Sequence, residues 1–211
     1  MMVIFKALSA LLSYPTEELR QALPEIAEVI RGSTLLALRQ REELLELIAE
    51  LSEGDLFAAE ERYVDLFDRG RALSLNLFEH LHGDGRDRGK AMVELKRLYA
   101  AAGLELSTRE LPDFLPVILE YLSCRDLREA REILGECAPI LASIGRSLIA
   151  RRSRYAAILQ ALLIIAGEQP VDSAKVPPVR EFPEALDRDW AERPAFADRG
   201  PSGSLSVNQR E

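Results

Sequence analysis

Cysteine and histidine are scarce in this 211-residue sequence, which contains two of each. Cys124 and Cys137 form no CxxC or Cys/His pattern, which excludes a disulfide-stapled fold and a structural zinc site. Both lie in leucine-rich segments, and we expect them to be small buried side chains in a reducing compartment. Basic residues are outnumbered by acidic ones, 27 to 35, so the net charge is −8. Because such a surface repels polyanions, we expect no nucleic-acid partner.

Long apolar runs are also absent. The most apolar stretch, residues 155–167, contains Gln160 and is shorter than the ~20 residues that span a bilayer. Near the N-terminus Lys6 interrupts the apolar run, and no small-residue cleavage site follows before Pro15. We therefore expect a cytoplasmic protein with no direct membrane insertion.

Threonine occurs only three times, whereas leucine occurs 35 times. This bias away from β-branched residues predicts an all-α fold. We expect a single helical-bundle-like domain of about eight to ten helices over residues 1–167. Six of the eleven prolines fall in the last 44 residues, where helical periodicity ends. That composition predicts a disordered acidic tail containing Pro, Ser and Gly, residues 168–211.

Prolines and short polar residues predict where the helices begin and end. Pro15 ends a first helix of about residues 3–13. Thr16 then caps a second helix, which Pro24 kinks or divides. Two further caps are expected: Asp55 before a helix ending near residue 67, and Ser153 before the last helix. Residues 126–152 are expected to form one helix that is either long or bent at Pro139.

The chemically reactive side chains form no catalytic pattern. His80 and His82 are two positions apart, so on a helix they point about 200° from one another and do not share a metal ion. We expect His82 to be half-buried and His80 to lie at the surface. The glycines of residues 83–90 do not match a phosphate loop, and no Ser/His/Asp set or GxSxG motif is present. We expect no catalytic residue, no metal site and no permanently bound cofactor.

Acidic side chains line one face of the helix predicted at residues 55–68. Helical spacing places Tyr63, Leu66 and Phe67 on one side and Glu61, Asp65 and Asp68 on the other. Like charges at these spacings destabilise a helix by roughly a few tenths of a kcal/mol, unless a cation meets them. Two interpretations stay open: an ordinary solvated face, or a surface for a cationic partner.

Residues 111–122 show a similar pattern. We expect Pro112 to open a helix in its first turn and Pro116 to bend it. Asp113 and Glu120 then share one stripe, about 10 Å apart along the axis. This separation is long for a two-carboxylate acid/base pair and suits an extended cationic partner, or else both acids face water.

Three segments together resemble a known family. These are EERYVDLFDRGRALSLNLFEHLHGDGRDRGKAM at 60–92, LPDFLPVILEYL at 111–122 and LSALLSYP at 8–15. They are similar to the NarJ family of nitrate reductase molybdenum cofactor assembly chaperones, within the TorD-like chaperones of molybdoenzymes. The likeness covers about residues 3–167, and the FEHLHG segment followed by RDRGKAM makes it specific.

The resemblance implies an all-helical cytoplasmic chaperone without enzyme activity. It implies a client, the N-terminal segment of the respiratory nitrate reductase catalytic α subunit, kept competent for molybdenum cofactor insertion before membrane docking. The chaperone is then not part of the final enzyme. The family's target is a basic, aromatic-containing helix. Whether the protein is a monomer or a weak homodimer stays open.

Combining the pattern with the resemblance gives three sets of site residues. The apolar groove is expected to use Tyr63, Leu66, Phe67, Leu75 and Phe78. The acidic peptide-binding residues are expected to be Glu61, Asp65, Asp68, Asp113 and Glu120. The family signature, to which the match assigns no individual roles, comprises Asp68, Arg69, Glu79, His80, His82, Gly83, Arg86, Arg88 and Gly89. For Arg86 and Arg88 we favour ion pairs with Asp84, Glu79 or Asp68 that lock this corner.

Two alternatives remain. Arg86, Arg88 and Lys90 could form an anion site in a carrier of a cofactor or nucleotide. A generic helical scaffold without a dedicated client is the other.

Overall fold

Helices make up the ordered framework of the chain. The computed structural model describes residues 2–81, 85–106 and 110–179. Within these ranges there is no β-strand, only an isolated antiparallel bridge between Asn76 and Phe114. The all-α prediction is confirmed. The elements are α1 (Val3–Leu12), α2 (Glu17–Gly32), α3 (Leu38–Ser52), α4 (Leu56–Phe67), η1 (Arg71–Leu73), α5 (Phe78–Leu81), α6 (Gly85–Ala101), α7 (Leu115–Ser123), α8 (Leu127–Ala150), α9 (Ala156–Ala166) and η2 (Ser173–Lys175).

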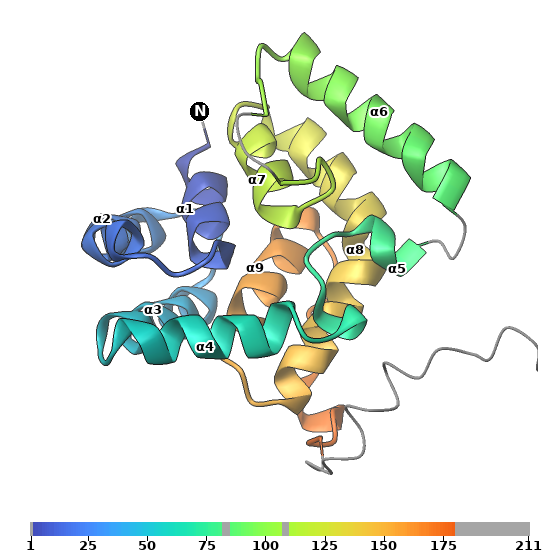
Figure 1. The fold of residues 1–211 in the computed structure, drawn as a ribbon. Helices are drawn as coiled ribbons and strands as arrows, with labels where there is room; N and C mark the ends of the chain where they lie inside the picture. The colour runs from blue at the N-terminus through green and yellow to red at the C-terminus, as the bar shows by residue number, and fades with distance from the viewer. Residues whose placement is uncertain (1, 82–84, 107–109, 180–211) are drawn as a thin grey trace, which may run out of the picture. The chain divides into compact units, whose positions relative to one another are not determined.

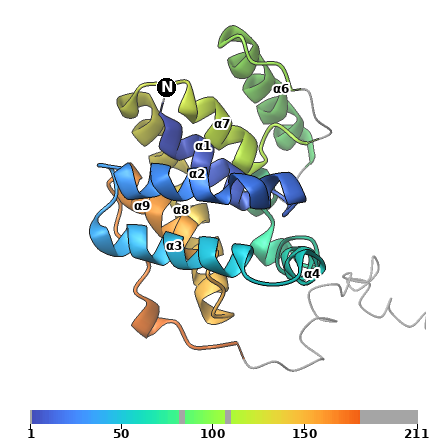
Figure 2. The same cartoon turned by 90° about the vertical axis from the view of Figure 1, so that its left-hand side faces the viewer.

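The core is built around α9, which is apolar on nearly every face and therefore buried. Helix α8 packs along it, α1 packs on α7, and α3 also contacts α9. Figure 2 shows α2 and α3 lying side by side over this core, and Figure 1 shows α6 at the edge. Within the described residues, α8 is the one helix long and apolar enough to cross a membrane. Leu134, Leu141 and Leu148 of α8 are buried against its neighbours, as in a core helix.

Local capping chemistry sets several helix ends. The Thr16 hydroxyl accepts the N–H of Leu19 at 3.2 Å, and the Asp126 carboxylate accepts that of Glu129 at 2.9 Å. The predicted Thr16 cap is confirmed, and the Asp126 cap is a finding of the structure. Asp55 holds the N-cap position of α4, but its side chain accepts no capping hydrogen bond. Before α9 the Ser153 carbonyl, rather than its hydroxyl, receives the N–H of Ala156.

The prolines lie at three different kinds of position. Pro24 lies inside α2 and Pro139 inside α8, and both helices run on through them. Helix α7 begins at Leu115, with Pro116 in its first turn, where the missing N–H costs nothing. The prediction of a helix opened by Pro112 and bent by Pro116 is therefore wrong.

Residues 168–179 lie against α8 and α9. The Gln160 side chain exchanges two hydrogen bonds with the backbone of Val171, each 2.8 Å, and the Val179 N–H binds the Ala150 carbonyl. Gly167 turns the chain with a φ of 89°, which glycine adopts without strain. This first part of the predicted tail thus contacts the helices, while residues 180–211 lie outside the described residues.

The two cysteines differ in exposure. Cys137 is partly buried, and burial raises the pKa of its thiol to about 11. Cys124 is exposed. The prediction that both are buried is wrong for Cys124, because α7 ends there and its C-cap faces solvent.

Candidate functional site: an acidic cleft with aromatic walls

A cleft of about 580 Å³ opens between α1, the end of α4, α7, residues 74–76, residues 104–106 and Glu110. Six aromatic side chains line it: Tyr14, Tyr63, Phe67, Tyr99, Phe114 and Tyr121. So do four exposed acids: Asp68, Glu105, Glu110 and Glu120. No Lys, Arg or His is among the described lining residues. The cleft therefore favours a ligand that is both cationic and apolar.

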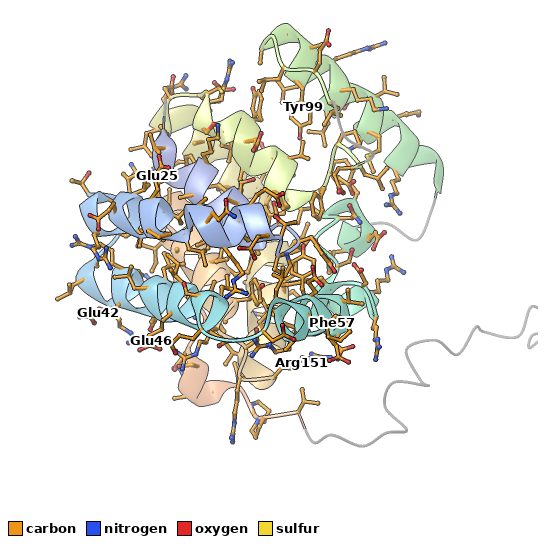
Figure 3. All side chains as sticks on the ribbon, turned by 60° about the vertical axis from the view of Figure 1, so that its left-hand side comes forward. Glu25, Glu42, Glu46, Phe57, Tyr99 and Arg151 are labelled. Atoms are coloured by element: carbon orange, nitrogen blue, oxygen red, sulfur yellow. The ribbon has the colours of Figure 1, made fainter. Side chains whose placement is uncertain are left out.

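The walls of the cleft are held by buried hydrogen bonds between distant segments. The Ser9 hydroxyl on α1 donates to the Pro116 carbonyl of α7 at 2.8 Å. The Tyr63 hydroxyl donates to the Leu12 carbonyl, and the Tyr99 hydroxyl to the Pro112 carbonyl, both at 2.7 Å. Figure 3 shows Tyr99 on the side of α6 nearest α7. Because these hydroxyls bind backbone, the two tyrosines present mainly their rings to a ligand.

The aromatic rings pack in edge-to-face and tilted pairs. Tyr63 lies 5.6 Å from Tyr14 and 4.8 Å from Phe67, and Phe67 lies 5.2 Å from Tyr155, measured between ring centroids. Tyr63 and Phe67 are buried, whereas Tyr14 is 44% exposed. The cluster thus consists of buried rings, Tyr63 and Phe67, and one ring that is open to solvent, Tyr14.

Burial and nearby carboxylates raise the pKa values of three tyrosine phenols at the cleft. Burial, followed by Glu60 and Asp68, raises the pKa of Tyr14. Burial also raises the pKa of Tyr63, with further contributions from Tyr155, Asp68 and Glu110. The same two influences raise the pKa of Tyr121 to about 12: burial first, then its hydrogen bond to Glu129. Burial and nearby carboxylates together therefore keep the phenols of Tyr14, Tyr63 and Tyr121 protonated.

Asp113 is a buried residue at the edge of the cleft that joins two segments of its wall; we call these contacts the Asp113 clamp. Its carbonyl accepts the Leu77 N–H and its Oδ2 accepts the Phe78 N–H, both at 3.0 Å. The adjacent Leu115 N–H binds the Leu75 carbonyl at 2.9 Å. Asp113 is 0% exposed, and burial raises the pKa of its carboxyl although the Phe78 N–H opposes that shift. Residues 75–78 are thereby fastened to the start of α7.

The predicted helical stripe with Asp113 and Glu120 on one face does not form. Asp113 lies before α7 rather than on it, so the two do not share a helical stripe. Asp113 is fully buried, while Glu120 is exposed and lines the cleft. The cause is the later start of α7, which sequence spacing does not reveal.

Of the five predicted groove residues, the cleft includes Tyr63, Phe67 and Leu75. Leu66 and Phe78 are half-buried and do not line it. Of the predicted acids on α4, Asp68 lines the cleft. Glu61 and Asp65 are exposed outside it, and Asp65 forms an ion pair with Arg69 at 2.9 Å.

The family-signature residues form a network beside the cleft. Arg88 pairs with Glu79 at 3.3 Å, which confirms one of the predicted ion pairs, and Arg71 Nε donates to the Glu79 carbonyl at 2.8 Å. His80 is half-buried with Nε2 2.8 Å from the Ser74 carbonyl, so its predicted surface position is wrong. The network immobilises residues 74–80, which include Ser74, Leu75 and Asn76 of the cleft wall.

The structure describes only some of the other signature residues. Gly89 is exposed on α6. His82 and Gly83 lie outside the described residues, as does the side chain of Arg86. Among the residues that the structure describes, no group of three or more His, Cys, Asp or Glu could hold a metal ion.

Several lining residues were not predicted from sequence. These are Tyr14, Tyr99, Phe114, Tyr121, Glu105 and Glu110. They come from four separate segments, so no periodicity connects them. The one available signal is that Tyr14, Phe114 and Tyr121 lie within the family-like segments 8–15 and 111–122.

Residues 14–157 match the model of the nitrate reductase delta subunit family. The chain belongs to this family. The matched range contains almost all of the cleft, from Tyr14 to Tyr121. The family resemblance noted in the sequence is thus confirmed.

Relatives in the delta subunit family support the assignment over the full length. The nitrate reductase molybdenum cofactor assembly chaperone NarJ of Escherichia coli K12 is 42% identical, over 99% of this chain and 92% of its own. The probable assembly chaperone NarJ of Bacillus subtilis 168 is 33% identical, over 76% of this chain and 86% of its own. A putative redox enzyme maturation protein from Archaeoglobus fulgidus shares the fold, with a TM-score of 0.55, 23% identity, and coverage of 77% of this chain and 91% of that one.

Proposed function

We propose that this protein is an assembly chaperone for respiratory nitrate reductase and not an enzyme. Its client is the N-terminal segment of the catalytic α subunit, which it keeps competent for molybdenum cofactor insertion before membrane docking. It acts in the cytoplasm, binds no cofactor permanently and is not part of the final enzyme. Similarity to assembly chaperones over nearly the whole chain supports the client, and the acidic cleft carries the binding step.

The chemistry of the cleft suits an amphipathic basic segment. Its aromatic walls remove apolar client surface from water, which stabilises the complex by about 25 cal/mol per Å². Its carboxylates select for Arg or Lys, because an acidic client would be repelled. Affinity and specificity are thus supplied by different side chains, as in helix-in-groove recognition.

The predicted site residues take three roles in this proposal. Tyr63, Phe67 and Leu75 contact the client, with Asp68 and Glu120 providing charge. Leu66 and Phe78 support the wall from behind, and Asp113 clamps it without touching the client. Glu61 and Asp65 extend the negative field along the outer face of α4.

Calorimetric titration of the full chain with a peptide of the α-subunit N-terminus tests the proposal. We expect saturable one-site binding that weakens as salt is added, since part of the attraction is between charges. A peptide of the same composition in scrambled order is the control. No heat and no rise in melting temperature with the native peptide, at any ionic strength, would overturn the assignment.

The anion-carrier alternative is less compatible with the contacts. Arg88, one of its three cations, is engaged by Glu79, and the cleft itself is acidic. Equilibrium dialysis against a guanine nucleotide separates the two functions, because the chaperone proposed here has no need to retain one. An unidentified scaffold role would instead leave the α-subunit peptide unbound.

A further inference from the structure

Helix α6 is joined to the rest of the molecule mainly through one tyrosine. Figures 1 and 2 both show α6 at the edge, and within the described residues it packs closely on none of the other helices. Of its described side chains, Tyr99 alone is buried. The Tyr99 hydroxyl donates to the Pro112 carbonyl at 2.7 Å, and its ring lies 5.3 Å from that of Tyr121. A helix with so few buried contacts belongs to the least stable parts of a fold.

Near the other end of α6, Arg88 pairs with Glu79 at 3.3 Å, and both side chains are partly exposed. An ion pair in contact with solvent adds little stability. Arg88 precedes Tyr99 by eleven residues, which is about 16 Å along a helix axis. The buried contacts of Tyr99 therefore hold α6 more firmly than this ion pair does, and Tyr99 is the point about which α6 can turn.

The apolar side of α6 is wider than the part that the core covers. At about 100° per residue, Leu95, Leu98 and Tyr99 lie within an arc of about 100°, with Leu98 at its outer edge. Leu95 packs partly against the core, whereas Leu98 is 39% exposed. Leu104 and Leu106, which follow α6, line the cleft together with Tyr99. The uncovered edge of α6 is therefore continuous with the cleft wall.

We propose that α6 is a flap that turns about Tyr99 and closes on the client segment in the cleft, so that Leu95 and Leu98 lie against the client. Closure removes the exposed leucine edge and apolar client surface from water together. The occupant is the client rather than a second copy of the chain, because a stable dimer buries about 800 Å² on each partner, far more than two leucines offer.

The flap rests on the proposed function and deepens it. The fixed walls of the cleft, on α1, α4 and α7, recognise the client. Closure of α6 then determines how long the client stays bound, since affinity differences within one interface arise mostly from dissociation rates.

The dissociation rate of the α-subunit peptide tests the flap. In Leu98→Gln closure buries a polar group, so the peptide should dissociate about three- to fivefold faster, with little change in association. Val93→Gln is the matched control, because Val93 is 48% exposed on α6 but lies about 140° from Leu98 around the helix. It should release the peptide like the unmodified chain. Equal effects of the two changes, or no effect of Leu98→Gln, would overturn the flap.

Hydrogen exchange gives a readout that a static wall would not change. In the free chain the backbone amides of residues 93–98 should exchange faster than those of α2, which packs closely on α1 and α3. Saturating α-subunit peptide should slow exchange at residues 93–98 by about tenfold or more and leave α2 unchanged. Unaltered exchange in α6 at saturation would contradict closure.

The outcomes separate the flap from the chaperone function. If the peptide binds but α6 does not respond, the flap is overturned and the proposed function stands. If no peptide binds, the proposed function fails, and the free chain tests the flap: Tyr99→Phe, which removes the hydrogen bond to Pro112, should speed exchange in α6 severalfold and not in α2. Exchange in α6 that is as slow as in α2 would overturn it. So would sedimentation showing that Leu98→Gln converts a dimer to a monomer, because the edge would then join two copies.

Discussion

The buried carboxylate of Asp113 accepts the backbone N–H of Phe78 at 3.0 Å, across 35 residues of sequence. Its second oxygen, Oδ1, is buried and has no hydrogen-bond partner among the residues that the structure describes. An unpartnered buried carboxylate oxygen is costly, so this clamp stabilises the cleft wall at the expense of desolvating an acid.

Replacing Asp113 by Ala should destabilise the fold. The Phe78 N–H then loses its acceptor in a buried site, which costs about 1–3 kcal/mol. Urea unfolding of the two proteins measures the difference. Asp113→Asn is the matched control, since its amide oxygen can still accept from Phe78, and it should lose less. Equal losses in both variants would show that the hydrogen bond is not the stabilising element.

The clamp should also make stability depend on pH. Burial raises the pKa of Asp113, so the folded state holds this proton more tightly than the unfolded state does. The stabilisation from this tighter proton binding is fully present below the ordinary aspartate pKa of 3.8. It is lost as pH rises through the raised pKa that Asp113 has in the folded state. The stability of the unmodified chain relative to Asp113→Asn should therefore fall across this window. Urea titrations at stepped pH would contradict this if the difference stayed constant.

Ser9 should be a stability residue rather than a client contact. Although it lines the cleft, it is 3% exposed and its hydroxyl joins α1 to α7 through the Pro116 carbonyl. Ser9→Ala should cost about 1 kcal/mol, seen as a lower melting temperature. The comparison is Ser52→Ala, where the lost bond runs to Ile48 within one turn of α3 and the residue is exposed. A larger loss in Ser52→Ala would contradict this interpretation.

Charge reversal on α4 should act through Asp68 rather than Asp65. Asp68 lines the cleft, whereas Asp65 lies outside it and is paired with Arg69. At low salt we expect Asp68→Lys to weaken α-subunit peptide binding about tenfold and Asp65→Lys by less than about twofold, with both effects shrinking as salt is added. Calorimetry at two ionic strengths measures this. Equal effects would indicate long-range attraction instead of a defined site.

The segment after α9 should depend on Gln160. Its amide exchanges both hydrogen bonds with the Val171 backbone, so Gln160→Ala should speed hydrogen exchange at the backbone amides of Val171 and Asp172. Gln160→Glu keeps only the acceptor for the Val171 N–H and should give intermediate exchange. Unchanged exchange in Gln160→Ala would show that other contacts hold this segment.

Local chemistry accounts for the features that could be predicted. The scarcity of threonine, the leucine periodicity and the Thr16 cap predict the helices, because each depends on residues within one or two turns. The start of α7 was missed because Pro112 and Pro116 are equally suited to a first turn. The helix begins next to Pro116 because the residues before it, around Asp113, form backbone hydrogen bonds with residues 75–78 instead of helical ones.

The sequence by itself determined that this is an acidic, all-helical chain of the delta subunit family, with Tyr63 and Phe67 on one side of a helix. Only the tertiary structure decided which acids face a ligand. Asp68, Glu110 and Glu120 reach the cleft from separate segments, while Asp113 turns inward to bind Phe78. The physical reason is that helical spacing specifies the angle of a side chain about its own axis, but its burial depends on which distant segment packs against it.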